Sequence, residues 1–147
     1  MALQVFHKSS RLPSPPGAVY DWHSRPGALQ RLSPPWERNE LLESTGGICD
    51  GARAVLEVRV GPAPVTWVAE HRNCIPGRQF TDFQVEGPFA YWEHAHRFEP
   101  IEPDACLLED RVEYALPLEP VSSLLSGHVV SGKLHRMFDF RHRVTAR

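Results

Sequence analysis

The stretch of sequence that decides the fold is "GPFAYWEHAHRFEP", residues 87–100. Side chains two positions apart on a strand point to the same face. A strand here, bounded by Gly-Pro and Glu-Pro, therefore carries four large side chains on one face, namely Trp92, His94, His96 and Phe98. Such a face could be part of a metal site, a catalytic histidine pair, or the wall of a half-polar cavity.

The same alternation extends over the neighbouring segments. Between Trp36 and Leu116, apolar and polar residues alternate, and turn sequences such as "GPAP", "IPGR" and "IEPDA" interrupt them. Consecutive strands joined by tight turns predict an antiparallel meander, here of six strands. Ahead of it, "LQVFHKSSRL" predicts a first strand, and the prolines of "PSPPG" and "SRPGA" predict two short helices.

The C-terminal segment has a helical pattern instead. After "PLEP" no proline occurs, and six residues follow a helical spacing: Val130, Leu134, Met137, Phe138, Arg141 and Val144. A half-buried sheet needs a cover, so this helix is expected to lie across one face. The predicted fold class is therefore α+β, a curved antiparallel sheet of about seven strands around a long C-terminal helix, with two short helices after the first strand.

Length and composition indicate a single globular domain and argue against nucleic-acid-binding and membrane-spanning proteins. The 147 residues carry a net charge of −2 and predict one domain, residues 1–147. No basic stretch is dense enough to predict nucleic-acid binding, and no apolar run could cross a bilayer. Three widely spaced cysteines predict reduced thiols and a cytoplasmic location. No Gly-rich turn for a dinucleotide is present, and no cofactor is predicted.

The strand register predicts which face is concave. Its polar members are expected to be His71, Asp82, Gln84, His94, His96, Asp110 and Tyr114. Its apolar members are expected to be Trp67, Phe80, Trp92, Phe98, Leu108 and Val112. The opposite face alternates glutamates with arginines, from Glu57 and Arg59 to Glu113, and is expected to face water.

Three interpretations of the polar set remain open. The pair His94 and His96 has the spacing of metal ligands, and Asp110 or His71 could complete the site. A histidine beside an aspartate could also act as a general acid or base. The third interpretation, which we favour, is that these groups hydrogen-bond to one another and form the polar end of a ligand cavity.

The layout resembles the helix-grip fold of the START-like (SRPBCC) superfamily over essentially the whole chain. It is most similar to the small domains found alone or ahead of an NAD-dependent epimerase-like domain. Four stretches carry the resemblance: "LPSPPGAVYDWHSRPGALQRLSPPWE", "GPAPVTWVAEH", "PGRQFTDFQVEGPFAYWEHAHRF" and "FDFRHRV". The resemblance implies binding of hydrophobic or amphipathic small molecules in a central cavity. Some distant members are cyclases, hydrolases or lipid carriers, and no catalytic residues can be carried over.

We therefore predict a binding protein for a hydrophobic or amphipathic small molecule, held between the sheet and the C-terminal helix. The predicted ligand-binding residues are Trp67, His71, Phe80, Asp82, Trp92, His94, His96, Phe98, Asp110, Val112, Tyr114, Leu134, Met137 and Phe138. Two alternatives are a cyclase- or hydrolase-type enzyme that uses a His/Asp pair in the same cavity, and a docking or regulatory domain for an epimerase-like partner.

Overall fold

The computed structural model describes residues 3–24, 32, 40–44, 48, 50–60, 63–116 and 127–146. In chain order, its elements are β1 (Gln4–Leu12), α1 (Pro16–Ser24), β2 (Glu40–Ser44), β3 (Arg53–Val60), β4 (Ala63–Ile75), β5 (Gln79–Glu86), β6 (Tyr91–Glu102), β7 (Ala105–Ala115) and α3 (Gly127–Thr145). The decisive stretch thus becomes β6. The second predicted short helix falls, apart from Leu32, on residues outside the described ranges.

The strands form one seven-stranded sheet in the order β1-β7-β6-β5-β4-β3-β2. All neighbouring strands are antiparallel, and β1 pairs with β7, the last strand in the chain. This confirms the predicted meander of six strands preceded by a separate first strand. It also confirms the α+β helix-grip architecture.

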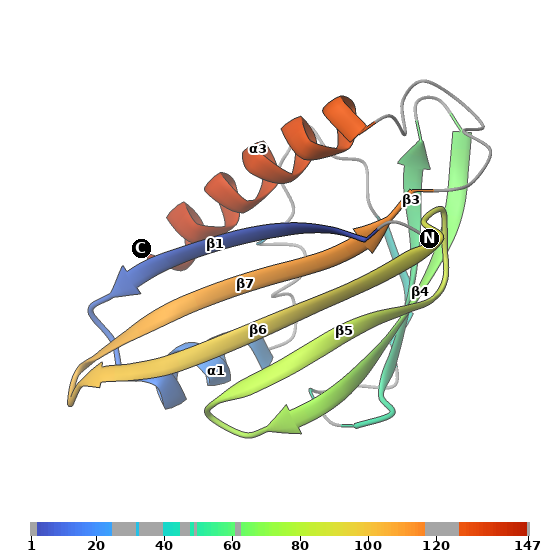
Figure 1. Ribbon diagram of the computed structural model, residues 1–147. Helices are drawn as coiled ribbons and strands as arrows, with labels where there is room; N and C mark the ends of the chain where they lie inside the picture. Colours follow the sequence, from blue (N-terminus) through green and yellow to red (C-terminus); the bar gives the residue numbers. More distant parts are fainter. Residues whose placement is uncertain are drawn as a thin grey trace.

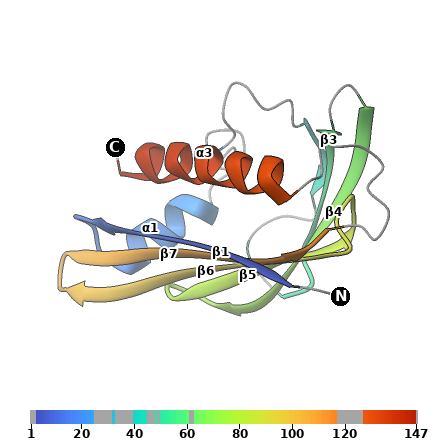
Figure 2. The same ribbon diagram turned by 45° about the horizontal axis from the view of Figure 1, so that its top comes forward.

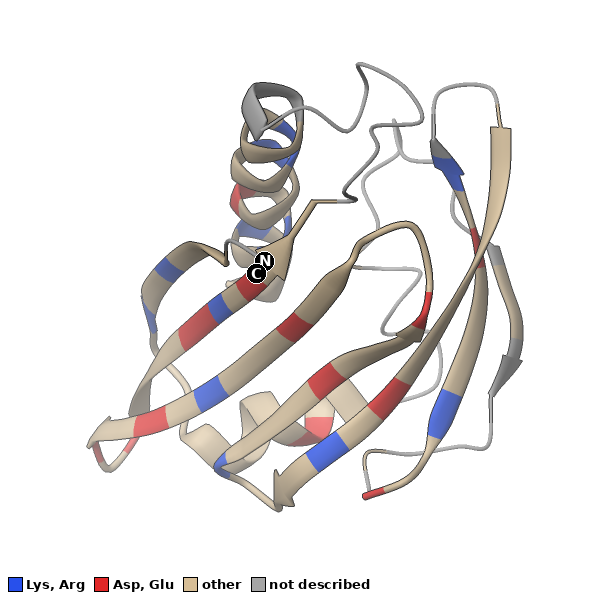
Figure 3. Cartoon of the chain, turned by 45° about the vertical axis from the view of Figure 1, so that its right-hand side comes forward, with Lys and Arg blue, Asp and Glu red and all other residues tan. Residues whose placement is uncertain are grey.

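Both described helices lie on the same side of the sheet (Figure 1). Helix α3 runs across β1 and β7, while α1 covers the other end of the same face. The sheet curves so that β3 and β4 rise toward the level of α3 (Figure 2). Charged residues recur along the strands (Figure 3). Arg72, Arg97 and Arg111 are exposed, whereas Asp110, on the covered face, is buried. This is the orientation that the sequence predicts.

Local features fix the turns between strands. Gly77 has a positive φ of 77° in the turn between β4 and β5, a conformation that glycine adopts at little cost. At the next turn, the Gln84 side chain donates to the Phe89 carbonyl and accepts from the Phe89 amide. A Cβ on Gly87 would lie 2.6 Å from Gln84 Cδ, so a larger residue here would displace the Gln84 side chain from these two hydrogen bonds.

The core consists of two apolar clusters on the covered face. The cluster associated with α3 contains Phe6, Trp92, Val112, Tyr114, Val130, Leu134 and Phe138. The cluster associated with α1 contains Leu12, Val19, Tyr20, Phe80, Phe98, Cys106 and Leu108. Cys74 and Cys106 are free thiols, as predicted, and burial raises the pKa of Cys106.

Candidate functional site

Cross-strand pairing brings five predicted polar residues together. Asp82 of β5 lies opposite His71 of β4 on one side and His94 of β6 on the other. His96 lies opposite Asp110 of β7. Because these positions share one face of the sheet, their side chains form a continuous polar strip between the two apolar clusters.

Asp110 is the centre of this strip. Its Oδ1 accepts a hydrogen bond from His94 Nε2 at 2.6 Å, and His96 Nδ1 lies 3.3 Å from the same oxygen. Its Oδ2 accepts a hydrogen bond from His142 Nε2 at 2.6 Å, and His142 comes from α3. One buried carboxylate therefore ties two adjacent strands to the C-terminal helix.

Asp82 extends the strip toward β4. Its Oδ2 accepts a hydrogen bond from His96 Nε2 at 2.8 Å. His71 Nδ1 lies 2.7 Å from Asp82 Oδ1, without the alignment of a hydrogen bond. We call the resulting set the His/Asp network, which consists of His71, Asp82, His94, His96, Asp110 and His142.

The network holds charge in the protein interior. Burial disfavours both carboxylates, yet hydrogen bonds from the histidines outweigh it and hold the pKa values of Asp82 and Asp110 well below the ordinary range. Burial likewise opposes the protonation of His96, but hydrogen bonds to Asp110 and Asp82 raise its pKa to about 9. Burial, aided by the positive charge of His96, lowers the pKa of His94 to about 4. At neutral pH, His96 is thus the cation and His94 is neutral.

Aromatic rings enclose the buried histidine pair of the network. The rings of His94 and His96 are stacked with centroids 3.7 Å apart, and Phe80 stacks on His96 at 4.0 Å. Phe138 of α3 makes a T-shaped contact with His94 at 5.0 Å. This packing shields the two histidines from water and fixes their ring orientations.

The predicted site residues divide into two groups by exposure. The buried ones are Phe80, Trp92, His94, His96, Phe98, Asp110, Val112, Tyr114, Leu134 and Phe138. Those that retain partial exposure are Trp67, His71, Asp82 and Met137. Gln84, which the sequence also places on the concave face, is buried and bonded to the Phe89 backbone.

Sequence reasoning missed two histidines at the site. His142 is buried, although the helical pattern assigned Arg141 and Val144 to the inner stripe. His23 of α1 packs its ring against Phe98 at 5.3 Å, and burial lowers its pKa to about 4. The signal for His142 was present, because it lies four residues after Phe138 and therefore on the same helix face.

The metal interpretation takes a different form in the structure. Donor atoms of Asp82, His94 and His96 all lie within 4.8 Å of one another. The sequence proposed Asp110 or His71 as the third ligand, whereas the geometry groups Asp82 with the histidine pair. Two of these three residues, His96 and Asp82, are already hydrogen-bonded to each other, so a metal ion that used those two atoms would replace their bond.

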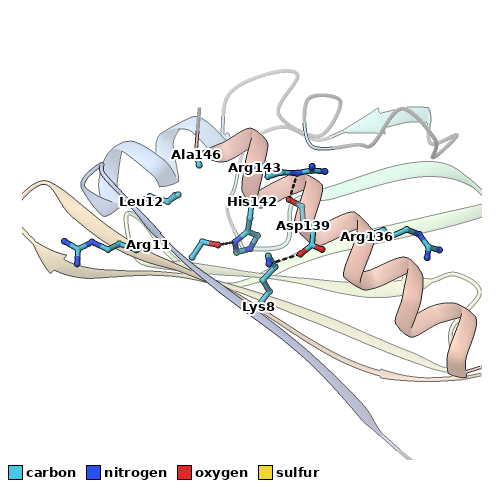
Figure 4. Close-up of a pocket in the computed structure, with 9 residues that line it drawn as sticks. Lys8, Arg11, Leu12, Arg136, Asp139, His142, Arg143 and Ala146 are labelled. Atoms are coloured by element: carbon cyan, nitrogen blue, oxygen red, sulfur yellow. Dashed lines mark hydrogen bonds and ion pairs between the residues drawn. The ribbon is translucent and has the colours of Figure 1, made fainter.

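A pocket of about 730 Å³ lies between β1 and α3 (Figure 4). Its wall includes Ser10 and Leu12 of β1 and Asp139, His142 and Arg143 of α3. Figure 4 shows His142 pointing from the helix toward the strand, with the Lys8 and Asp139 pair beside it. None of the predicted ligand-binding residues lines this pocket.

Among the described residues, no helix is long and apolar enough to cross a membrane.

Comparisons with known proteins agree with this architecture. A nucleoside-diphosphate sugar epimerase from Corynebacterium glutamicum matches with 26% identity and a TM-score of 0.74, over 96% of this chain and 28% of its own. The chain thus spans little more than a quarter of that protein. The Zhui aromatase/cyclase from a Streptomyces species matches with 15% identity and a TM-score of 0.76, over 99% and 92% of the two chains.

A START superfamily protein from Mycobacterium smegmatis matches with 16% identity and a TM-score of 0.68, over 95% and 96% of the two chains. At 15% and 16% identity, the last two likenesses establish the fold alone. A search of curated proteins gave no significant match. Residues 12–140 match the family described as polyketide cyclase/dehydrase and lipid transport. The chain therefore belongs to that family.

Proposed function

We propose that the protein binds an amphipathic small molecule against the concave face of the sheet, beside β4 and β5. The observation that carries this proposal is the open end of the His/Asp network. His71 is 20% exposed and Asp82 is 26% exposed, whereas the other four members are almost fully buried. A ligand can therefore reach the network at this end.

The spacing along β4 suggests the shape of the ligand. Trp67, Ala69 and His71 point to the same face, so Trp67 and His71 are about 13 Å apart at the usual rise of a strand. Trp67 retains partial exposure and packs its ring against Trp92 at 5.1 Å. An apolar or aromatic portion would lie on Trp67, and a polar group would lie at His71 and Asp82.

The charge of the network suggests the polar group. Because Asp82 stays ionised at neutral pH, it offers acceptor oxygens to a hydroxyl, phenol or amine on the ligand. The family description, which includes lipid transport, supports a ligand with a large apolar portion. The similar fold of the Zhui aromatase/cyclase is compatible with an aromatic ring in that portion.

Ala69 provides the decisive variant. Its small side chain lies between Trp67 and His71 on the same strand face, so Ala69→Leu would fill the space between them while every network residue stays unchanged. Val68→Leu adds a methylene to the opposite face and serves as the matched control. The measurement is native and denaturing mass spectrometry of each protein, with fluorescence titration of 8-anilinonaphthalene-1-sulfonate as a defined probe.

We expect a small organic molecule that is released on denaturation, or saturable probe binding, in the wild type and in Val68→Leu. Ala69→Leu should lose the molecule and weaken probe binding by about tenfold, a free-energy change of about 1.4 kcal/mol. Equal binding by all three folded proteins would contradict the proposed location. Stoichiometric metal in the same samples would instead support the metal interpretation.

The epimerase likeness favours a second candidate function, docking to an epimerase-like domain. The match covers 96% of this chain but only 28% of the Corynebacterium glutamicum protein, so a similar unit occurs there as one part of a longer chain. The remaining part of that protein is the natural probe. Titration calorimetry with it should show stoichiometric binding if docking is the function, and absence of heat would count against this candidate.

A further inference from the structure

A serine, a histidine and an aspartate are hydrogen-bonded in series at the pocket between β1 and α3. Ser10 Oγ donates to His142 Nδ1 at 2.6 Å, and His142 Nε2 donates to Asp110 Oδ2 at 2.6 Å. Ser10 and His142 both line the pocket. We propose that these three residues form a catalytic triad that hydrolyses small esters or thioesters bearing a carboxylate group.

The arrangement assigns a role to each residue. Asp110 accepts the proton-bearing nitrogen of His142, which leaves the lone pair of Nδ1 directed at the Ser10 hydroxyl. A nucleophile bonded to a base, with the base oriented by a carboxylate, is the geometry by which triads are recognised. The two ring nitrogens are exchanged relative to the serine proteases, but the sequence of roles is the same.

The burial of the three residues matches these roles. The side chains of His142 and Asp110 are 4% and 7% exposed, so the base and its orienting group are held rigidly. Ser10 is only partly buried and reaches the pocket. Hydrogen bonds from three histidines keep Asp110 ionised, and the positive charge of His96 partly offsets the cost of burying it.

The pocket lining indicates the substrate class. Four cationic side chains and one carboxylate line it, namely Lys8, Arg11, Arg136, Arg143 and Asp139. Asp139 is paired with Lys8 at 2.8 Å and Arg11 is paired with Glu102, so the excess of positive charge in the lining comes from Arg136 and Arg143. Such a pocket favours an anionic substrate, and arginines are suited to a carboxylate. Leu12 and Ala146 add short apolar surfaces for a small hydrocarbon portion.

The reaction balances with water as the only co-reactant. Ser10 Oγ attacks the carbonyl carbon while His142 Nδ1 takes the hydroxyl proton. The bond to the leaving alcohol or thiol breaks, and the imidazolium of His142 protonates that group. A water molecule, deprotonated by His142, then attacks the acyl-serine and releases the acid, and the proton returns to Ser10.

Labelling with a fluorophosphonate tests the nucleophile directly. This reagent phosphonylates an activated serine with loss of fluoride, and intact-mass and fragment spectra locate the adduct. We expect one adduct on Ser10 that disappears in Ser10→Ala. Ser9→Ala is the matched control, because Ser9 is exposed and faces the other side of β1. A folded wild type without an adduct on Ser10 would overturn the proposal.

A second variant tests whether His142 acts as a general base or only packs against Ser10. His142→Gln keeps a polar side chain in place but cannot act as a general base, and circular dichroism checks that it folds. Its labelling rate should fall by at least about 100-fold, in line with the loss of a general base. A folded His142→Gln protein that labels at the wild-type rate would overturn the assignment of the base.

Hydrolysis tests the substrate class. Mono(4-nitrophenyl) succinate carries a carboxylate, whereas 4-nitrophenyl butyrate is its neutral counterpart. We expect kcat/KM to favour the succinate by about tenfold or more, and the double variant Arg136→Gln, Arg143→Gln to remove this preference. Arg97→Gln, on the outer face, should not change it. Equal hydrolysis of both esters by the wild type would refute the substrate class.

The outcome does not depend on ligand binding at the concave face. Ala69→Leu, which should abolish that binding, is expected to leave labelling of Ser10 unchanged. Failure of one proposal therefore leaves the other intact.

Discussion

Asp110 is the residue on which the most interactions of the polar strip depend. It faces three histidines, and its side chain is 7% exposed. Asp110→Asn would leave protonated His96 with only Asp82 as an anionic partner, and it would weaken the attachment of α3 through His142. Removing one partner of a buried ion pair is costly, so we expect a loss of about 3–5 kcal/mol in the free energy of unfolding, measured with urea.

The control for this variant lies one position away. Glu109→Gln alters a charge on the outer face of the same strand, where ion pairs contribute about 0–1 kcal/mol. If Asp110→Asn proved no more destabilising than Glu109→Gln, the carboxylate would not be what holds the network together.

Prediction of single residues from the sequence succeeded in the strands, where side chains alternate between the two faces of the sheet. His71, Asp82, His94, His96 and Asp110 lie on one face because their strands alternate, and that alternation is visible in the printed sequence. The hydrogen-bonding partners were not predictable, because they depend on side-chain angles and on the register between strands.

The histidines on helices escaped prediction for a different reason. The spacing of four residues from Phe138 indicates the inner helix face for His142, but the sequence does not show which group its imidazole would bind there. The structure supplies that partner, the carboxylate of Asp110 in β7.

At the scale of elements, α3 contains a position where stability can be increased. Gly132 lies inside the helix, and a Cβ there would meet only the Arg136 guanidinium, at 3.4 Å and beyond. Glycine destabilises a helix interior relative to alanine, so Gly132→Ala should raise the free energy of unfolding by about 0.5–1 kcal/mol. Thermal unfolding followed by circular dichroism would measure the change. A lower melting temperature would mean that the helix is not regular at this position.

A destabilising variant in the same helix tests which contact holds α3 on the sheet. Phe138 is fully buried, stacks on Phe6 at 5.2 Å and meets His94 with its edge. Phe138→Ala would leave a cavity between helix and sheet and should cost about 3–5 kcal/mol. Arg136→Ala, on the exposed side of the same turn, is the control and should change stability by less than about 1 kcal/mol. Similar effects from the two variants would show that α3 is held by its ends rather than by this contact.

At the scale of the whole molecule, the order and pairing of the strands could be predicted from the sequence, because proline and glycine mark the turns between them. A meander leaves few alternatives once its turns are located. The position of the pocket did not follow from it. A curved sheet around a helix was expected to leave space between them, and large side chains such as Phe138 and Trp92 occupy part of that region. The pocket of Figure 4 lies at the margin, where α3 meets the edge strand β1.

The pH dependence of stability belongs to this scale, because it depends on groups from several elements. The fold raises the pKa of some of these groups and lowers the pKa of others. The pKa of His94 is lowered to about 4, so its contribution to stability is lost as the pH falls below about 6.5. Asp82 and Asp110, whose pKa values are also lowered, add to that loss below about pH 4. The pKa of His96 is raised to about 9, so its contribution is complete below about pH 6.5 and is lost as the pH rises through 9.

Stability should therefore be greatest at about pH 6–7 and decline on both sides, by at most about 1.4 kcal/mol per pH unit for each titrating group. Urea unfolding between pH 4 and pH 10 would measure the curve. In His96→Gln no cation remains to be lost, so the decline between pH 6.5 and 9 should disappear, although the variant is less stable throughout. A wild-type protein that gained stability over that alkaline interval would mean that His96 is neutral in the fold, and the two carboxylates would then have to share their negative charge without it.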